Sequence, residues 1–131
     1  QRLLEVTEGS LMTCIETACF PGKRLFDIAY AIENYVIANG FHVIEKYGGH
    51  GLGRGLHEAP FIPNEVMPHL NLRLKAGMCL AIEPMVTAGS GRVKVKRDGW
   101  TVITREKKNA AHFEHSIYIT ETGPVILTLP E

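Results

Sequence analysis

Apolar side chains recur at helical spacing in the first third of the chain. Residues 1–20 carry apolar positions at Leu3, Leu4, Leu11, Met12, Ile15 and Cys19. Residues 25–38 carry them at Leu25, Ile28, Ala29, Ile32, Tyr35 and Val36. These spacings predict two amphipathic helices, the first ended by Pro21-Gly22 and the second by the C-cap signal Asn39-Gly40. Two such helices in succession need a sheet or further helices to cover their apolar faces.

The remainder of the chain has the pattern of β structure. Apolar runs bounded by turn residues predict six strands, over 41–47, 78–86, 92–97, 100–104, 112–120 and 125–129. The segment 48–55 holds five glycines and is expected to be an irregular loop, and 59–76 holds three prolines and is expected to be a surface excursion. Asp98-Gly99 predicts a hairpin turn. Strands that follow the helices, rather than alternating with them, predict an α+β fold with a mainly antiparallel sheet.

Composition and charge narrow the classes of function. The 131 residues suit one domain. Fourteen basic and fourteen acidic side chains cancel, so no recognition of a nucleic-acid sequence is expected. No apolar run reaches the ~18 residues of a membrane-spanning helix, so no membrane partner is expected. Three cysteines without regular spacing, Cys14, Cys19 and Cys79, indicate buried thiols in a reducing compartment such as the cytoplasm.

A few polar residues interrupt the apolar pattern. Glu83 ends an apolar run, where a carboxylate is costly to bury unless it is paired or bound to a cation. Pro84 follows it and must end the strand or make it bulge. Glu114 lies in the last long predicted strand. His50 stands between glycines, which allow the backbone to approach a ligand closely, and His57 follows seven residues later.

These residues leave two interpretations open. A solvated strand face, or a cross-strand Glu–His pair, would account for Glu114 without any ligand. Two histidines in a glycine-rich segment and two strand carboxylates together favour a metal site. A phosphate-binding loop at 49–53 is disfavoured because no helix pattern follows the glycines. Imidazole and carboxylate ligands suit Mn, Fe(II), Co or Zn, so the residues predict a metal-assisted hydrolase whose substrate stays open.

Three blocks of sequence resemble the type I methionine aminopeptidases, which have the pita-bread (creatinase/aminopeptidase) fold. The first block is 49–58, Gly-His-Gly-Leu-Gly-Arg-Gly-Leu-His-Glu, and the second is 77–86, Gly-Met-Cys-Leu-Ala-Ile-Glu-Pro-Met-Val. The third runs from Asp-Gly-Trp-Thr at 98–101 to His-Phe-Glu-His at 112–115 and on to Thr120. The likeness extends over essentially the whole chain. It implies the C-terminal half of the pita-bread fold and removal of the N-terminal methionine from nascent peptides.

The resemblance also implies roles for single residues. His50 would be the family's one histidine ligand, Glu83 a ligand of the same metal that also moves a proton, and Glu114 the carboxylate that bridges two divalent metal ions. His57 would be the catalytic histidine that contacts the scissile carbonyl. Leu56 and Trp100 match positions near the pocket for the methionine side chain, although plain strand packing would account for them equally well. Nascent peptide N-termini are the implied partner, which makes the ribosome a candidate as well.

The chain departs from the family pattern in its ligand set. The family uses five protein ligands, and two of them are aspartates from strands that precede the first helix seen here. Asp27 and Asp98 are the only aspartates, and neither has the matching context. We therefore expect residues 1–131 to be a single partial domain, with a helix pair at about 1–40 and a β-rich metal-site region at about 41–131.

Three origins are compatible with this partial ligand set. The chain begins with Gln1 rather than Met, which favours a part of a longer enzyme that is inactive alone. A catalytically inactive relative that serves as a peptide- or protein-binding module is the main alternative. The third origin is a site that another chain completes.

Overall fold

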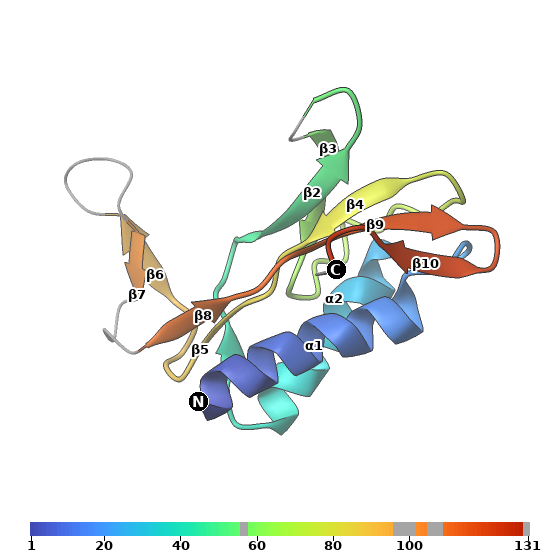
Figure 1. The fold of residues 1–131 in the computed structure, drawn as a ribbon. Helices are drawn as coiled ribbons and strands as arrows, with labels where there is room; N and C mark the ends of the chain where they lie inside the picture. The colour runs from blue at the N-terminus through green and yellow to red at the C-terminus, as the bar shows by residue number, and fades with distance from the viewer. Residues whose placement is uncertain (56–57, 96–101, 105–108, 130–131) are drawn as a thin grey trace.

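Two helices lie side by side on one face of an antiparallel sheet (Figure 1). The computed structural model describes residues 1–55, 58–95, 102–104 and 109–129, and side chains are not described for 93–95 and 102–104. Helix α1 spans Arg2–Ala18 and helix α2 spans Leu25–Ala38. Both predicted helices are therefore confirmed. The second begins and ends at the residues that its apolar spacing predicted.

Asp27, one of the two aspartates in the chain, caps the N-terminus of α2. The backbone N–H of Arg24, the N-cap residue, donates to Asp27 Oδ2 over 2.8 Å. A carboxylate in the first turn satisfies a free amide and interacts favourably with the helix dipole. Asp27 thus has a structural partner in the helix itself.

The main sheet has five antiparallel strands in the order β10-β9-β4-β2-β3. Their bounds are β2 Gly48–Leu52, β3 Glu58–Pro63, β4 Cys79–Ile82, β9 His115–Thr120 and β10 Gly123–Ile126. Strand β10 replaces the predicted strand 125–129, because Gly123 and Pro124 already pair with β9.

Two expectations about the sheet were wrong. Residues 48–52 form β2 rather than an irregular loop, because the glycines let β2 lie unusually close to β4. A Cβ on Gly49 would overlap the carbonyl oxygen of Ala81. Residues 58–63 form β3 rather than part of a surface excursion. Prolines are tolerated there because β3 is the edge strand of this sheet and one side of its backbone needs no partner.

The chain also forms two smaller sheets. Strands β1 His42–Val43, β5 Met85–Thr87 and β8 Ala110–His112 pair in the order β1-β5-β8. Strands β6 Val93–Val95 and β7 Val102–Thr104 pair antiparallel. The turn predicted at Asp98-Gly99 lies outside the described residues. The strand predicted over 41–47 is reduced to β1.

Two long predicted strands are each divided between two sheets. The predicted strand 78–86 breaks at Glu83-Pro84 into β4 and β5, as the proline indicated. The predicted strand 112–120 breaks at Phe113-Glu114 into β8 and β9, which the sequence did not indicate. The register is the same on both sides of the breaks, since Ile82 pairs with His115 and Met85 with His112. The two breaks therefore lie side by side.

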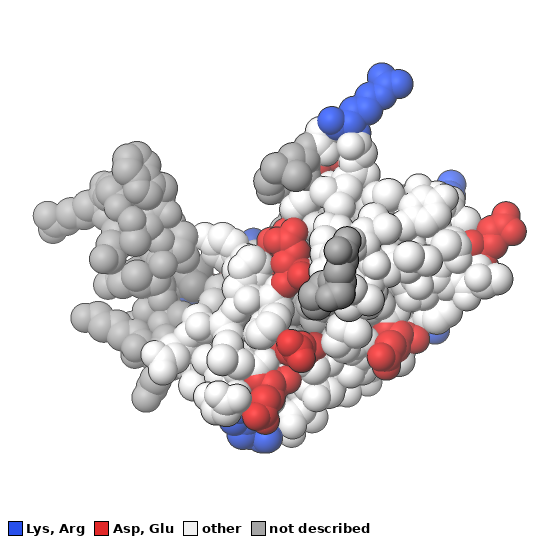
Figure 2. Space-filling model, viewed as in Figure 1, with Lys and Arg blue, Asp and Glu red and all other residues white. Residues whose placement is uncertain are grey.

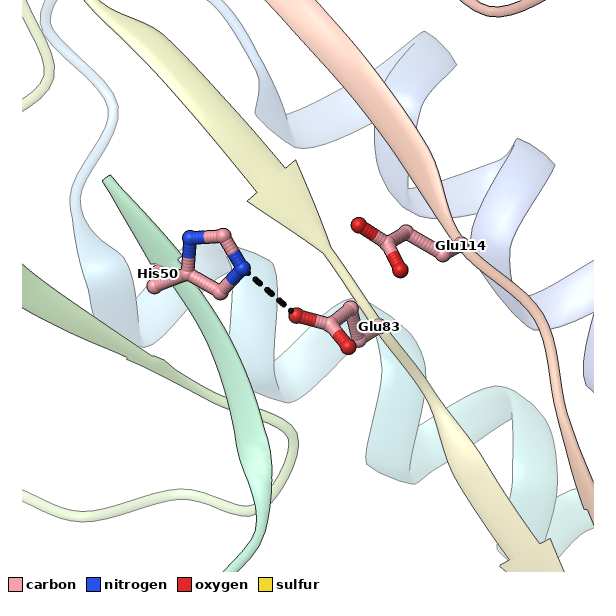
Figure 3. Close-up of side chains that lie close together, drawn as sticks. All are labelled: His50, Glu83 and Glu114. Atoms are coloured by element: carbon pink, nitrogen blue, oxygen red, sulfur yellow. Dashed lines mark ion pairs between the residues drawn. The ribbon is translucent and has the colours of Figure 1, made fainter. Parts of the chain in front are cut away.

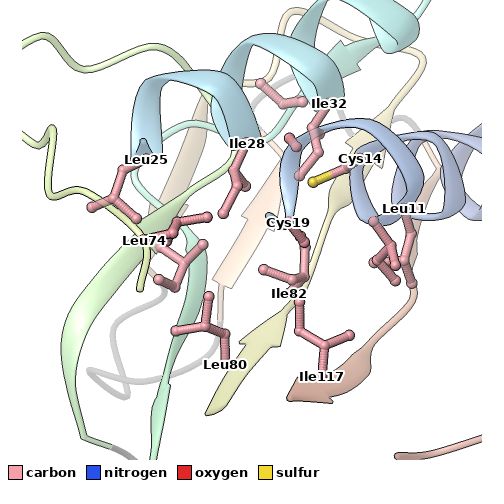
Figure 4. Close-up of a cluster of buried hydrophobic side chains, with 14 of the residues drawn as sticks. Leu11, Cys14, Cys19, Leu25, Ile28, Ile32, Leu74, Leu80, Ile82 and Ile117 are labelled. Atoms are coloured by element: carbon pink, nitrogen blue, oxygen red, sulfur yellow. The ribbon is translucent and has the colours of Figure 1, made fainter. Parts of the chain in front are cut away.

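The core lies between the helices and the near face of the main sheet. Figure 4 shows buried side chains of both helices meeting those of β4 and β9, namely Leu11, Cys14, Ile28, Ile32, Leu80, Ile82 and Ile117. Cys14 and Cys19 are fully buried and free. Their mutual hydrogen bond, and then burial, raise the pKa of the Cys14 thiol well above its usual range. The prediction of buried thiols is confirmed for these two cysteines, whereas Cys79 in β4 is only partly buried.

Candidate metal centre

Three predicted site residues meet on the face of the main sheet that points away from the helices. His50 in β2 is opposite Ala81 in β4, and Ala81 is opposite Ser116 in β9. Opposed residues of paired strands share a face, and so do residues two apart along one strand. Glu83 follows Ala81 by two positions, and Glu114 precedes Ser116 by two. Figure 3 shows all three side chains converging in front of the strands, with the helices behind.

The three side chains of this cluster lie close enough together to share one cation. One ligand atom each from His50, Glu83 and Glu114 lie within 4.8 Å of one another. Metal–ligand bonds of about 2.0–2.2 Å place ligands on opposite sides of one ion roughly 4 Å apart. A small closure of the cluster would bring all three onto the same ion. One imidazole and two carboxylates also form a donor set that suits borderline divalent ions.

The orientation of the His50 ring is compatible with a cation beside Nε2. His50 Nδ1 lies 2.9 Å from the carbonyl oxygen of Gly51, and a carbonyl can only accept a hydrogen bond. In this contact Nδ1 carries the proton, so a neutral ring turns the lone pair of Nε2 outward. That Nε2 lies 3.0 Å from Glu83 Oε2. A lone pair and a carboxylate oxygen at this distance repel each other unless a proton or a cation lies between them.

Burial within the cluster is uneven. The His50 and Glu83 side chains are 15% and 13% exposed, whereas Glu114 is exposed. Two ligands are therefore largely withdrawn from water, and the third is on the open side. On the face in Figure 2, acidic side chains stand in separate groups across the surface and basic side chains stand nearer its margins.

Two neighbours that the sequence did not single out as site residues hold Glu83 in place. The Asn64 side chain donates from Nδ2 to the Glu83 carbonyl oxygen over 2.7 Å. Asn64 is fully buried, and its Oδ1 has no hydrogen-bond partner among the described residues. His112 Nε2 lies 3.3 Å from Glu83 Oε1. His112 and Glu114 are two apart in the predicted strand 112–120, so strand alternation is the one signal in the sequence that relates them. Asn64 lies in the expected surface excursion over 59–76.

Three other predicted site residues cannot be placed in this cluster. Leu56, His57 and Trp100 all lie outside the described residues, so their roles stay predictions. In the part of the chain that is described, no helix has the length and apolar character to cross a membrane.

Comparisons with protein-family models and with curated proteins point to one family. The model of metallopeptidase family M24 matches residues 1–121. Methionine aminopeptidase 1 of Bacillus subtilis is 54% identical over 128 residues, which cover 98% of this chain and 51% of that protein. Methionine aminopeptidase of Clostridium perfringens is 49% identical over 129 residues, with 98% and 51% covered. The chain thus spans about half the length of these curated relatives.

Solved structures give the same picture. The crystal structure of methionine aminopeptidase from Thermotoga maritima matches with a TM-score of 0.91 and 49% identity, over 98% of this chain and 51% of that one. Prolidase from Pyrococcus furiosus matches with a TM-score of 0.74 and 22% identity, over 99% of this chain and 32% of that one. The second likeness shows a shared fold alone.

Proposed function

Because the chain belongs to metallopeptidase family M24, we propose that it supplies part of the metal centre of a methionyl aminopeptidase. The expected family and the pita-bread fold are both confirmed by the relatives. The reaction proposed is hydrolysis of the peptide bond after an N-terminal methionine, with nascent peptides as substrates. The relatives from Bacillus subtilis and Clostridium perfringens carry the name of this activity.

The observation that supports this function best is the paired arrangement of His50 and Glu83. Nε2 and Oε2 face each other at 3.0 Å, and Nδ1 of the same ring lies 2.9 Å from the Gly51 carbonyl oxygen. We propose His50 and Glu83 as ligands of one divalent ion, and Glu114 as the carboxylate that bridges this ion to a second. Co, Mn, Fe(II) and Zn all suit these ligands. Such an ion, when bound, polarises a carbonyl and lowers the pKa of a water molecule.

The remaining roles concern the substrate. Glu83 is also proposed to accept and return a proton during the reaction. His57 is proposed to donate a hydrogen bond to the scissile carbonyl, and Leu56 and Trp100 to line the pocket for the methionine side chain. These three assignments rest on the family resemblance. Residues 1–131 alone are expected to be inactive, since the two aspartate ligands of the family have no match here.

The test is release of methionine from a Met-Gly-Met peptide by the full encoded chain with added Mn(II) or Co(II). We expect activity in the wild type and its loss in His50→Ala. The matched control is His69→Ala, which removes an exposed histidine from a loop and is expected to leave the rate unchanged. Full activity in His50→Ala would refute the ligand role. Absence of activity in the wild type would instead support the inactive peptide-binding module.

A further inference from the structure

The Glu83 carboxylate is held between two histidines from different sheets. Oε2 lies 3.0 Å from Nε2 of His50 in β2, and Oε1 lies 3.3 Å from Nε2 of His112 in β8. Figure 3 shows one Glu83 oxygen on His50 and the other turned away from it. The two oxygens of this side chain therefore have different partners.

We propose that His112 is a positioning residue that holds Glu83 Oε1 and so keeps Oε2 available, together with His50 Nε2, for the cation. This inference rests on the proposed function. The terminal torsion of a glutamate is broad and roughly two-fold, so without such a contact either oxygen, or both, could turn to the ion. A hydrogen bond to Oε1 selects one oxygen and fixes the plane of the carboxylate.

The geometry favours positioning over direct ligation by His112. The set of side chains whose ligand atoms all lie within 4.8 Å of one another comprises His50, Glu83 and Glu114, and His112 is not in it. Its Nε2 lies 3.3 Å from a carboxylate oxygen of Glu83, and carboxylates that ligate a metal are themselves commonly hydrogen-bonded by an outer partner. The partner of such a pair acts on the metal through the ligand.

The other groups near Glu83 cannot hold its Oε1 atom in this way. Asn64 donates to the Glu83 backbone carbonyl and leaves the carboxylate free. Glu114 has only acceptor oxygens when it is ionised. Among the described residues, the contact seen with Glu83 Oε1 comes from the His112 side chain. It is also 47% exposed, so it can be replaced without opening a cavity in the core.

The experiment compares His112→Leu with His112→Gln in the full encoded chain. Leucine removes the donor, whereas glutamine keeps an N–H donor without an imidazole. Binding of Co(II) alone is measured by calorimetry, and the Co(II) absorption spectrum reports on coordination. Changes in the residues that support a ligand weaken metal affinity by about 10–100-fold, and we expect a loss of that order in His112→Leu. His112→Gln is expected to restore affinity and spectrum close to those of the wild type.

Two controls separate this inference from the proposed function. Thermal unfolding of the metal-free proteins checks that His112→Leu folds, and His69→Leu removes an exposed histidine elsewhere. Wild-type affinity in His112→Leu, with binding lost in His50→Ala, would refute the positioning role alone. An equal loss in the glutamine and leucine variants would also refute it, because a retained donor would then have no effect. Wild-type binding in His50→Ala would refute the ligand set of the proposed function.

Discussion

The backbone N–H of Phe113 donates to the carbonyl oxygen of Pro84 over 3.3 Å. This bond joins the two places at which the chain leaves one sheet for another. Glu83 and Glu114 are the neighbours of these two residues, so the bond also fixes the spacing between the two candidate carboxylate ligands. The cluster is therefore held by backbone pairing on both sides of the breaks.

Gly49→Ala should destabilise the fold at the strand that carries His50. The added methyl group would overlap the Ala81 carbonyl, and β2 would have to move away from β4. Overpacking of this kind costs about 1–3 kcal/mol of unfolding free energy, which urea denaturation measures. Gly55→Ala is the control, since the nearest atom to its Cβ would lie 3.4 Å away on a side chain. Equal stability of the two variants would contradict the close approach of β2 and β4.

Asn64→Ala should lower both stability and metal affinity. The Glu83 carbonyl, whose hydrogen bond to Asn64 is partly buried, would lose the donor that lies 2.7 Å away. Leaving a buried acceptor unpaired costs about 1–3 kcal/mol, and the break that carries Glu83 would lose its anchor. Denaturant unfolding and Co(II) calorimetry check the two effects. Asn34→Ala, at an exposed position on α2, is expected to change neither.

Glu114→Gln should reduce the number of divalent ions bound per chain. In the proposed arrangement Glu114 bridges the two ions, and His50 and Glu83 also hold the first. An amide keeps the size of the side chain but removes its charge, so the first ion should remain. Metal analysis after equilibrium dialysis of the full encoded chain measures the ratio, with the exposed Glu121→Gln as control. An unchanged ratio would show that Glu114 is not a ligand.

Glu33→Gln should stabilise the protein only at higher pH. Burial raises the pKa of the Glu33 carboxyl, the Val66 backbone lowers it, and the nearby Glu65 carboxylate raises it. A raised pKa means that the native state holds this proton more tightly than the unfolded chain does. The stability that this provides is present below the ordinary glutamate pKa and is lost as pH rises through the raised value.

The measurement for Glu33 is urea unfolding at two pH values. Below the ordinary pKa of glutamate, wild type and Glu33→Gln should unfold at the same urea concentration. At neutral pH the variant should need more urea. Glu16→Gln, an exposed position on α1, should show no such pH-dependent gain. A gain of equal size at both pH values would mean that ionisation of Glu33 is not its cause.

The sequence predicted the helices and the position of one strand break well. Apolar stripes at helical spacing are rarely produced by anything except an amphipathic helix, and Pro84 cannot continue a hydrogen-bonded ladder. Strand β2 was missed because glycines have low strand propensity and carry no side-chain pattern. The break at Phe113-Glu114 has neither proline nor glycine, so only its pairing with the Glu83-Pro84 break reveals it.

The candidate site was predictable in part. Glu83 stood out because it ends an apolar run, and His50 stood out because it stands between glycines. Asn64 did not, because an asparagine after a proline is an ordinary turn signal. Its importance depends on a contact nineteen residues away in the chain, and the sequence pattern contains no trace of that contact.

Core and cluster lie on opposite faces of the same strands, which makes the site unusually sensitive to insertions and deletions. In β4, Leu80 and Ile82 belong to the core while Ala81 between them is opposite His50. Adding or removing one residue within β4 would turn every later side chain of the strand to the other face. Glu83 would then point toward the helices, and an apolar residue would take its place beside His50. Substitutions in β4 can affect the core or the cluster separately, but a change in its length affects both at once.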